Sequence, residues 1–219
     1  MEAKKIDNSL PIAREGIPFM LFGAGLTGIF FILDLPGLAI PFAVLTSFII
    51  FFFRDPKRKL VNREKAVLTP ADGKIISIEK LANGDNRFKD TAVKLSIFMS
   101  IFDAHINRIP IAGKIDQLIY HPGKFFSANL DKASLYNENN VVMLETDKRE
   151  KIVFVQVAGL IARRIACWVK PGDCVKAGQR FGLIRFGSRL EVYLPPDSII
   201  TVRKGEKVKA GQTVLGYLL

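Results

Sequence analysis

The pattern of hydrophobic and polar positions divides the chain into two regions. From Ile17 to Phe53 the only charged residue is Asp34, and the run is long enough for about two membrane-crossing helices of about 20 residues each. Beyond residue 66, short segments such as TAVKLSIFMS and KIVFVQVAG are rich in β-branched residues and bounded by turn formers, as is typical of strands. Residues 127–135 are predicted to form a short helix, with Ser127 or Asn129 as its N-cap. The pattern predicts a mainly β (α+β) protein with an N-terminal hydrophobic helical hairpin.

The apolar run is expected to reverse direction near its middle. Asp34, Pro36 and Gly37 combine a charge with helix-breaking residues, which favours a tight turn between two helices. We therefore expect helices over about 17–33 and 35–53. The run is too long for a cleaved signal peptide, and no small-residue cleavage site follows it. Each half is short for a span, so both a spanning and a re-entrant hairpin remain open.

Charge supports a membrane partner. The formal net charge is +11 and the pI is about 9.7, which indicates an acidic partner such as a membrane surface or nucleic acid. Residues 54–65, RDPKRKLVNREK, hold six basic and two acidic residues directly after the apolar run, and this clustering favours the membrane over nucleic acid. The positive-inside tendency places this flank and the N-terminus in the cytoplasm. The expected plan is a cytoplasmic segment 1–16, a membrane hairpin 17–53, a basic linker 54–65 and a β-rich catalytic domain 66–219.

The C-terminal part contains an internal repeat. WVKPGDCVKAGQRFGLIRF resembles TVRKGEKVKAGQTVLGYLL, with VKAGQ at 175–179 and again at 208–212, and with Gly172 matching Gly205. A pair of strand–turn–strand units predicts a quasi-symmetric β-sandwich similar to the barrel-sandwich hybrid of biotinyl and lipoyl carrier domains. The segment FGSRLE links the two copies, so Ser188 could lie in an ordinary connecting hairpin.

Cysteine usage argues against a zinc site or a disulfide scaffold. Cys167 and Cys174 are the only cysteines, and the chain has two histidines. A zinc site needs a tighter cluster, and a small secreted scaffold needs more cysteines. We expect reduced thiols in a domain that faces the cytosol and holds no metal.

Few residues are candidates for chemistry. FMSIFDAHINRIP contains Asp103, His105 and Arg108, YHPGKFF contains His121, and TPADGKI contains Asp72. A histidine near a strand end is more often structural, and PADG is a typical turn sequence. However, both histidines adjoin Pro or Gly turns, where functional residues are common. The chain has no CxxC, P-loop or GxSxG sequence, which removes most metal, P-loop nucleotide and hydrolase functions.

Taken together, the motifs resemble a known family. PADGKI, FMSIFDAHINRIP, HPGKFFSANLDKASLYNENN and GSRLEVYLP, in this order, resemble phosphatidylserine decarboxylase proenzymes of the short bacterial and archaeal type. The resemblance covers nearly the whole chain. It implies a carboxy-lyase that converts phosphatidylserine to phosphatidylethanolamine and CO2. It also implies self-cleavage between Gly187 and Ser188 into a β chain, 1–187, and an α chain, 188–219.

The resemblance further implies a cofactor made from the chain. Ser188 Oγ would attack the Gly187 carbonyl to give an ester, and elimination and hydrolysis would leave a covalently bound pyruvoyl group in place of Ser188. Glycine at 187 adds no Cβ, so the oxygen can approach. The pyruvoyl ketone would form a Schiff base with the substrate amine and accept electrons as CO2 leaves. Neither a metal nor a free cofactor is implied.

Site roles follow from matching residues to the family pattern. His105 matches the proton donor, and Asp72 matches an aspartate that promotes self-cleavage. The larger relatives carry a second histidine three residues after the first, where this chain has Arg108, and arginine is not a base at neutral pH. The base for self-cleavage therefore remains open between His121 and Asp72. Arg108 is a candidate to bind the substrate carboxylate or phosphate, with a surface charge beside a turn as the alternative.

Partners and location follow in the same way. The resemblance implies phosphatidylserine as a membrane substrate, the α and β chains as a heterodimer that could oligomerise further, and the bacterial inner membrane with the catalytic domain on its cytoplasmic side. No nucleic-acid partner is expected. Two alternatives remain: a non-catalytic carrier domain, which would need a lysine where FGSRLE stands, and a membrane-bound serine hydrolase, which would keep an uncut chain.

Overall fold

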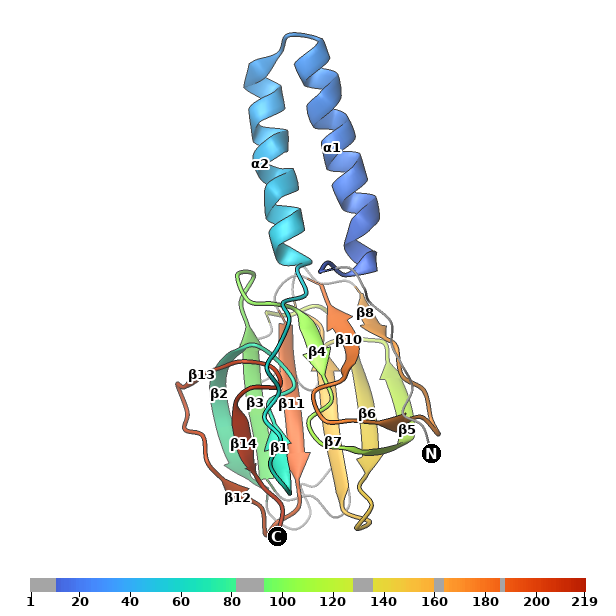
Figure 1. Ribbon diagram of the computed structural model, residues 1–219, viewed down its shortest axis with the longest axis vertical. Helices are drawn as coiled ribbons and strands as arrows, with labels where there is room; N and C mark the ends of the chain where they lie inside the picture. Colours follow the sequence, from blue (N-terminus) through green and yellow to red (C-terminus); the bar gives the residue numbers. More distant parts are fainter. Residues whose placement is uncertain (1–10, 82–92, 128–135, 160–163, 186–187) are drawn as a thin grey trace. The chain divides into compact units, whose positions relative to one another are not determined.

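A computed structural model describes residues 11–81, 93–127, 136–159, 164–185 and 188–219 (Figure 1). The chain divides into two compact units whose boundary in the sequence lies between Lys57 and Arg58. The helix expected over 127–135 lies, from residue 128 onward, outside the described residues.

The first unit is the expected helical hairpin. After a 3-10 turn, Arg14–Gly16, helix α1 spans Ile17–Ile32 and helix α2 spans Pro36–Phe52. Asp34 reverses the chain with φ +54°, a left-handed conformation that aspartate tolerates better than most residues. The helices pack closely, because Gly23 leaves no room for a Cβ beside Thr46 Oγ1 and the rings of Phe30 and Phe42 stack 5.3 Å apart. The prediction of a hydrophobic hairpin is confirmed.

The hairpin exposes apolar side chains. Phe31 and Ile32 are 79% and 82% exposed, and Phe22 and Val44 are also exposed. Segment Arg14–Ile32 is long and apolar enough to cross a membrane, whereas Pro36–Phe52 is shorter. A contiguous exposed apolar surface is costly in water and marks an interaction with another apolar phase. The hairpin is therefore consistent with membrane association.

The second unit is built from short strands. Their bounds are β1 Ala66–Leu68, β2 Gly73–Lys80, β3 Val93–Met99, β4 Ile106–Arg108, β5 Gly113–His121, β6 Asn139–Glu145, β7 Lys151–Val157, β8 Ile165–Cys167, β9 Cys174–Val175, β10 Arg180–Ile184, β11 Ser188–Leu194, β12 Ile199–Ile200, β13 Lys207–Val208 and β14 Val214–Tyr217. The mainly β class predicted from the sequence is confirmed.

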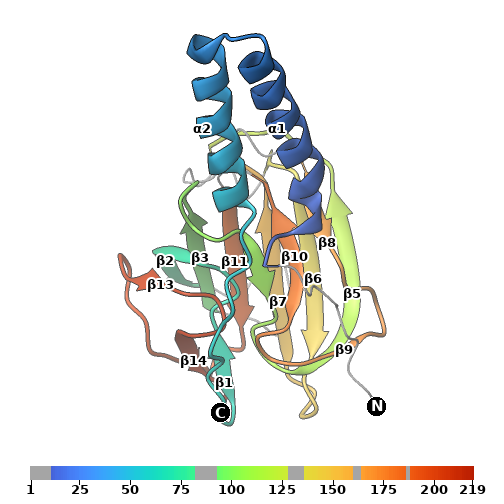
Figure 2. The same cartoon turned by 45° about the horizontal axis from the view of Figure 1, so that its top comes forward.

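The strands form one large sheet and two small ones. The large sheet has the order β13-β2-β3-β11-β7-β6-β5-β9, and the small sheets are β1-β14-β12 and β4-β10-β8. Every described pairing between named strands is antiparallel. The small sheets lie over one face of the curled large sheet (Figures 1 and 2). The main core lies between the large sheet and the small sheets. There the ring centroids of Phe154 and Phe181 lie 4.8 Å apart.

The internal repeat is confirmed and extends further than the sequence indicated. Strands β8, β9 and β10 match β12, β13 and β14, and the turn glycines Gly172 and Gly205 have φ of +90° and +92°. The segments β1–β2 and β4–β5 also match, because Leu68 N donates to Pro110 O and Arg108 N donates to Pro70 O, both at 2.8 Å. The second unit is thus a quasi-two-fold arrangement of two similar halves.

The repeat gives the large sheet two equivalent ends. We call one the Ser188 end, formed by Asp72, Met99–Arg108 and Ser188. We call the other the hairpin end, formed by Ala112 and the β6–β7 turn Thr146–Glu150. Matching strand registers make Ser188 the counterpart of Glu150, and Asp72 the counterpart of Ala112.

Ser188 does not lie in a connecting hairpin. β10 belongs to a small sheet, whereas β11 is a central strand of the large sheet between β3 and β7. Every residue of β11 is buried, so the strand needs partners on both edges and cover on both faces. The hairpin alternative is therefore wrong, because the two runs around Ser188 join different sheets.

Candidate active site

Ser188 is the first residue of the central strand β11 and is fully buried. It lies opposite Met99, the last residue of β3, and its Oγ donates to Met99 Sδ at 3.4 Å. A thioether sulfur is a weak acceptor, so this contact restrains the hydroxyl only loosely. A nucleophile at this place is shielded from bulk water.

The PADG turn brings Asp72 to the same end of the sheet. Lys74 pairs with Phe98, which pairs with Arg189, so the turn before β2 lies level with the start of β11. Gly73 has φ +149°, and a Cβ there would collide with Phe98 O. Only glycine lets the turn approach β3 this closely.

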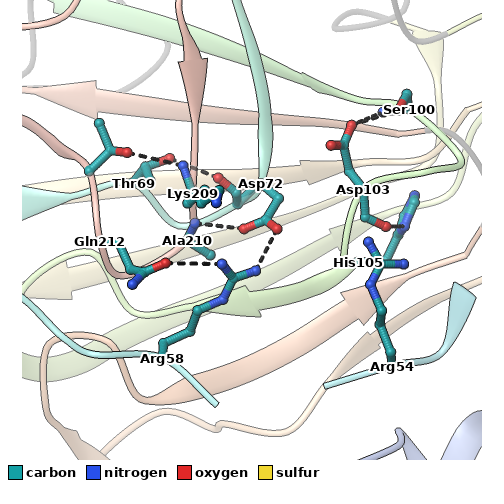
Figure 3. A network of polar contacts seen from close by, with 12 residues as sticks. Arg54, Arg58, Thr69, Asp72, Ser100, Asp103, His105, Lys209, Ala210 and Gln212 are labelled. Atoms are coloured by element: carbon teal, nitrogen blue, oxygen red, sulfur yellow. Dashed lines mark hydrogen bonds and ion pairs between the residues drawn. The ribbon is translucent and has the colours of Figure 1, made fainter. Parts of the chain in front are cut away.

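Both oxygens of the Asp72 carboxylate are bonded (Figure 3). Oδ2 accepts from Arg58 Nη2 at 2.5 Å, and Oδ1 accepts from the Ala210 backbone N–H at 2.7 Å. Arg58 Nη1 also donates to Gln212 Oε1 at 3.1 Å. The Arg58 and Asp72 side chains are only 9% and 11% exposed. These charge-assisted bonds hold the carboxylate in one orientation.

His105 is held in the loop between β3 and β4. Its side chain is fully buried, and Nδ1 lies 2.9 Å from Asp103 O. Asp103 Oδ2 in turn accepts from Ser100 N at 2.8 Å and from Ser100 Oγ at 2.7 Å (Figure 3). Because a carbonyl only accepts, Nδ1 carries the proton, and Nε2 is the atom that can gain or give one.

Arg108 lies beside the Asp72 turn. Its backbone N–H donates to Pro70 O at 2.8 Å, and its Nη1 donates to Gly178 O at 3.0 Å. The residue is only 7% exposed, which excludes a solvated surface charge. Its contacts join β4 to the PADG turn and to the turn of the repeat.

His121 lies apart from the other candidates. It is exposed at the end of β5, where it pairs with Asn139. Strands β6 and β7 separate β5 from β11, which is about 14 Å along the sheet at the usual strand spacing. The structure therefore brings together Asp72, His105, Arg108 and Ser188, but not His121.

Three buried amides at the Ser188 end were not identified from the sequence. Asn140 Nδ2 donates to Gln156 Oε1 at 3.0 Å, and Gln156 Nε2 donates to Asn107 Oδ1 at 2.9 Å. Asn107 Nδ2 then reaches Met99 Sδ at 3.7 Å. The available signal was an uncharged polar residue within an otherwise apolar strand, as in KIVFVQVAG.

Other parts of the described chain offer less chemistry. A cavity of about 420 Å³ lies at the hairpin end, lined by Lys114, Asp116, Glu145 and Arg149 among others. It contains no histidine, serine or cysteine. Among the described residues no three His, Cys, Asp or Glu side chains are grouped to hold a metal, and Cys167 and Cys174 are not joined in a disulfide.

Comparison with known proteins identifies the family. A family model described as phosphatidylserine decarboxylase matches residues 45–216. The chain belongs to the phosphatidylserine decarboxylase family. A phosphatidylserine decarboxylase proenzyme from Desulfotalea psychrophila is 50% identical over 96% of this chain and 98% of its own length. Those from Syntrophus aciditrophicus and Geotalea uraniireducens are 48% and 45% identical, over 94% and 97% of this chain and 96% and 99% of theirs.

This membership confirms the resemblance seen in the sequence. Phosphatidylserine decarboxylase proenzymes match the chain over almost their whole length, so the apolar N-terminal region falls within the similarity as well as the β unit. The family match also favours an enzyme over the carrier domain and the serine hydrolase considered above.

Proposed function

We propose that this protein decarboxylates phosphatidylserine to phosphatidylethanolamine at the Ser188 end, with a pyruvoyl group made from Ser188. The observation that carries the proposal is the placement of Ser188. It is the buried first residue of a central strand, and Asp72 and His105 lie at the same end of the sheet. Family membership supplies the reaction class.

The proposed maturation uses Ser188 as the nucleophile. Its Oγ attacks the Gly187 carbonyl carbon, the C–N bond breaks, and an ester replaces the amide. Loss of the Ser188 Cα proton then expels the Gly187 carboxylate and leaves dehydroalanine. Water replaces the nitrogen, which departs as ammonia, and a ketone remains. Asp72 directly precedes β2, which only β3 separates from β11, whereas β6 and β7 separate His121 from β11, so Asp72 is better placed than His121 to support these proton transfers.

The fold suits a cut at this bond. β11 pairs with β3 through seven residues and with β7 through five, so residue 188 would keep its place after cleavage. Glu191 lies on the face of β11 opposite to Ser188. Its Oε1 lies 3.4 Å from Lys94 Nζ and 3.5 Å from Arg189 Nη1. The Glu191–Lys94 pair would tie the α chain to β3, and the Arg189–Glu191 pair lies within the α chain itself. The α and β chains would therefore remain a heterodimer.

Decarboxylation then needs an electron sink and a proton donor. A pyruvoyl ketone supplies the sink for the electron pair that CO2 leaves behind. His105, fixed through Nδ1 by Asp103 O, would deliver a proton from Nε2 to the substrate carbon. The sequence suggested that Arg108 binds the substrate. Its contacts with Pro70 and Gly178 instead favour a role in holding the Asp72 turn in place.

The N-terminal helical hairpin accounts for how such an enzyme reaches its substrate. A diacyl lipid stays in the bilayer, so its headgroup must be processed at the surface. We propose that the exposed apolar hairpin anchors the protein in the bacterial inner membrane. The basic residues of 54–65 would face the cytoplasm and attract anionic lipid.

The proposal is tested with vesicles that contain phosphatidylserine labelled at the serine carboxyl group. Purified protein should release labelled CO2 and form phosphatidylethanolamine. The variant Ser188→Ala should release none, whereas Glu150→Ala, its counterpart at the hairpin end, should match the wild type. Equal release by Ser188→Ala and the wild type would contradict the proposal.

A further inference from the structure

The buried amides at the Ser188 end form a directional chain. Asn140 donates to Gln156, Gln156 donates to Asn107, and Asn107 reaches the sulfur of Met99. Asn107 and Gln156 are fully buried, and Asn140 is 5% exposed. The chain crosses from β6 and β7 of the large sheet to β4 of a small sheet. It ends at the same sulfur that accepts from Ser188 Oγ.

The fold itself does not require this chain. The internal repeat gives each amide a counterpart at the hairpin end: Val93 for Asn140, Leu194 for Gln156 and Val67 for Asn107. All three counterparts are apolar and buried in the main core. Burying an amide costs free energy unless it is hydrogen-bonded. At the hairpin end, three apolar side chains fill the equivalent positions without that cost. The amides therefore point to a need specific to the Ser188 end.

The last donor of the chain has a weak partner. Asn107 Nδ2 lies 3.7 Å from the Met99 sulfur, and Ser188 Oγ lies 3.4 Å from the same sulfur. The distance from Asn107 Nδ2 to Ser188 Oγ therefore cannot exceed the sum of these two distances. Sulfur is a weak acceptor. Conversion of Ser188 to a pyruvoyl group would remove Oγ, which leaves with the Gly187 carboxylate, and would place on the neighbouring Cα a ketone oxygen that only accepts. Such an oxygen is a better partner for the amide than the sulfur.

We propose that the Asn107 carboxamide, oriented by Gln156 and Asn140, donates a hydrogen bond to the ketone oxygen of residue 188 in the mature enzyme. The Met99 sulfur accepts this N–H in the precursor. The inference rests on the proposed function. When an amine adds to the ketone carbon, negative charge develops on the oxygen, and a fixed neutral donor stabilises that charge. The amides behind Asn107 keep the donor oriented, so the addition needs little reorganisation.

The test compares three variants by two measurements. Asn107→Leu keeps the approximate shape without a donor, and Gln156→Met removes the group that orients Asn107. Asn139→Leu makes the same chemical change one residue from Asn140, on a side chain that donates to Asn137 O and faces the other side of the sheet. Chain cleavage is followed on a denaturing gel. The ketone is probed by its rate of reaction with a hydrazine, whose nitrogen adds to the carbonyl carbon before water leaves.

All three variants should cleave, because the ketone does not exist before the cut. The hydrazine reaction of folded, mature Asn107→Leu should be slower by about 100-fold, as for loss of one preorganised donor at a developing oxyanion. Gln156→Met should be slower by a smaller factor, and Asn139→Leu should match the wild type. In guanidinium chloride all rates should converge, because the effect belongs to the folded site.

Three results would overturn the inference. They are equal hydrazine rates for folded Asn107→Leu and wild type, an uncut but folded Asn107→Leu chain, and an equal slowing by Asn139→Leu. If Asn107→Leu fails to fold, an unchanged rate in Gln156→Met would overturn it. A wild-type protein that is itself uncut and unreactive toward hydrazine would instead overturn the proposed function.

Discussion

The Ser188 end and the hairpin end share one backbone plan but are closed in different ways. At the hairpin end β6 turns directly into β7. Thr146 N donates to Glu150 O at 3.0 Å, and Arg149 takes φ +63° in the turn. At the Ser188 end the neighbouring strands β3 and β11 meet at Met99 and Ser188, which are 89 positions apart in the sequence. One end is a local turn, and the other is assembled from distant segments.

This difference favours the Ser188 end over the hairpin end as the proposed site of chemistry. A local turn is exposed, and its residues serve to reverse the chain. The distant junction buries the start of a strand and gathers side chains from separate loops around it. Asp72 is present at the Ser188 end, whereas its counterpart at the hairpin end is Ala112. The Ser188 end thus differs from the hairpin end by a few polar residues on the same framework.

The largest expected effect separates the two histidines. His105→Gln should still cleave, but its decarboxylation rate should fall by about 1000-fold, within the usual range for loss of a general acid. His121→Gln should stay within about twofold, because two strands separate it from β11 and such a distance excludes direct proton transfer. The measurement is CO2 release from vesicles by mature protein. A similar loss in both variants would contradict the placement of the site.

A smaller effect is expected for Asp72 in self-cleavage. Asp72→Asn should slow the cut at least tenfold, because an amide cannot accept a proton as a carboxylate does. Arg58→Met removes the bonded partner of Asp72 and should cleave within a few-fold of the wild type if the carboxylate itself acts. Asp147→Asn, exposed at the hairpin end, is the matched control. Pulse–chase on a denaturing gel measures all three rates.

Slowing by Arg58→Met equal to that of Asp72→Asn would show that the ion pair, and not the carboxylate alone, is needed.

The smallest effect tests the equivalence of the two repeats. Gly172→Ala and Gly205→Ala should each lower the free energy of unfolding by about 1 kcal/mol, because alanine is strained at positive φ. Space is not the cause: a Cβ meets nothing within 4 Å at Gly172 and only Lys74 Cε, at 3.9 Å, at Gly205. Denaturant unfolding measures both values. A difference greater than about 1 kcal/mol would break the equivalence.

Features set by local sequence could be predicted, and features set by distant contacts could not. The hairpin followed from an apolar run with Asp34 and Pro36 near its middle, and the repeat followed from two VKAGQ segments with matching glycines. The second part of the repeat, in which β1–β2 matches β4–β5, has diverged too far to be detected from the sequence pattern alone. It becomes clear only from paired backbone bonds such as Arg108 N to Pro70 O.

The site shows the same limit. The turn sequences around Asp72 and His105 marked them as candidates, but the Arg58–Asp72 bond and the amide chain join residues far apart in the sequence. Whether Ser188 lay in a hairpin depended on which sheet each flanking strand joins. Strand order is a tertiary property that a local pattern does not contain.

The proposed site depends on the bond before Ser188 breaking and leaving a ketone. Intact-mass measurement of purified active protein tests it most directly. We expect two chains, residues 1–187 and 188–219, with the smaller one lighter by one ammonia than its sequence requires and lacking an N-terminal amine. A single uncut chain of 219 residues that is fully active would contradict it.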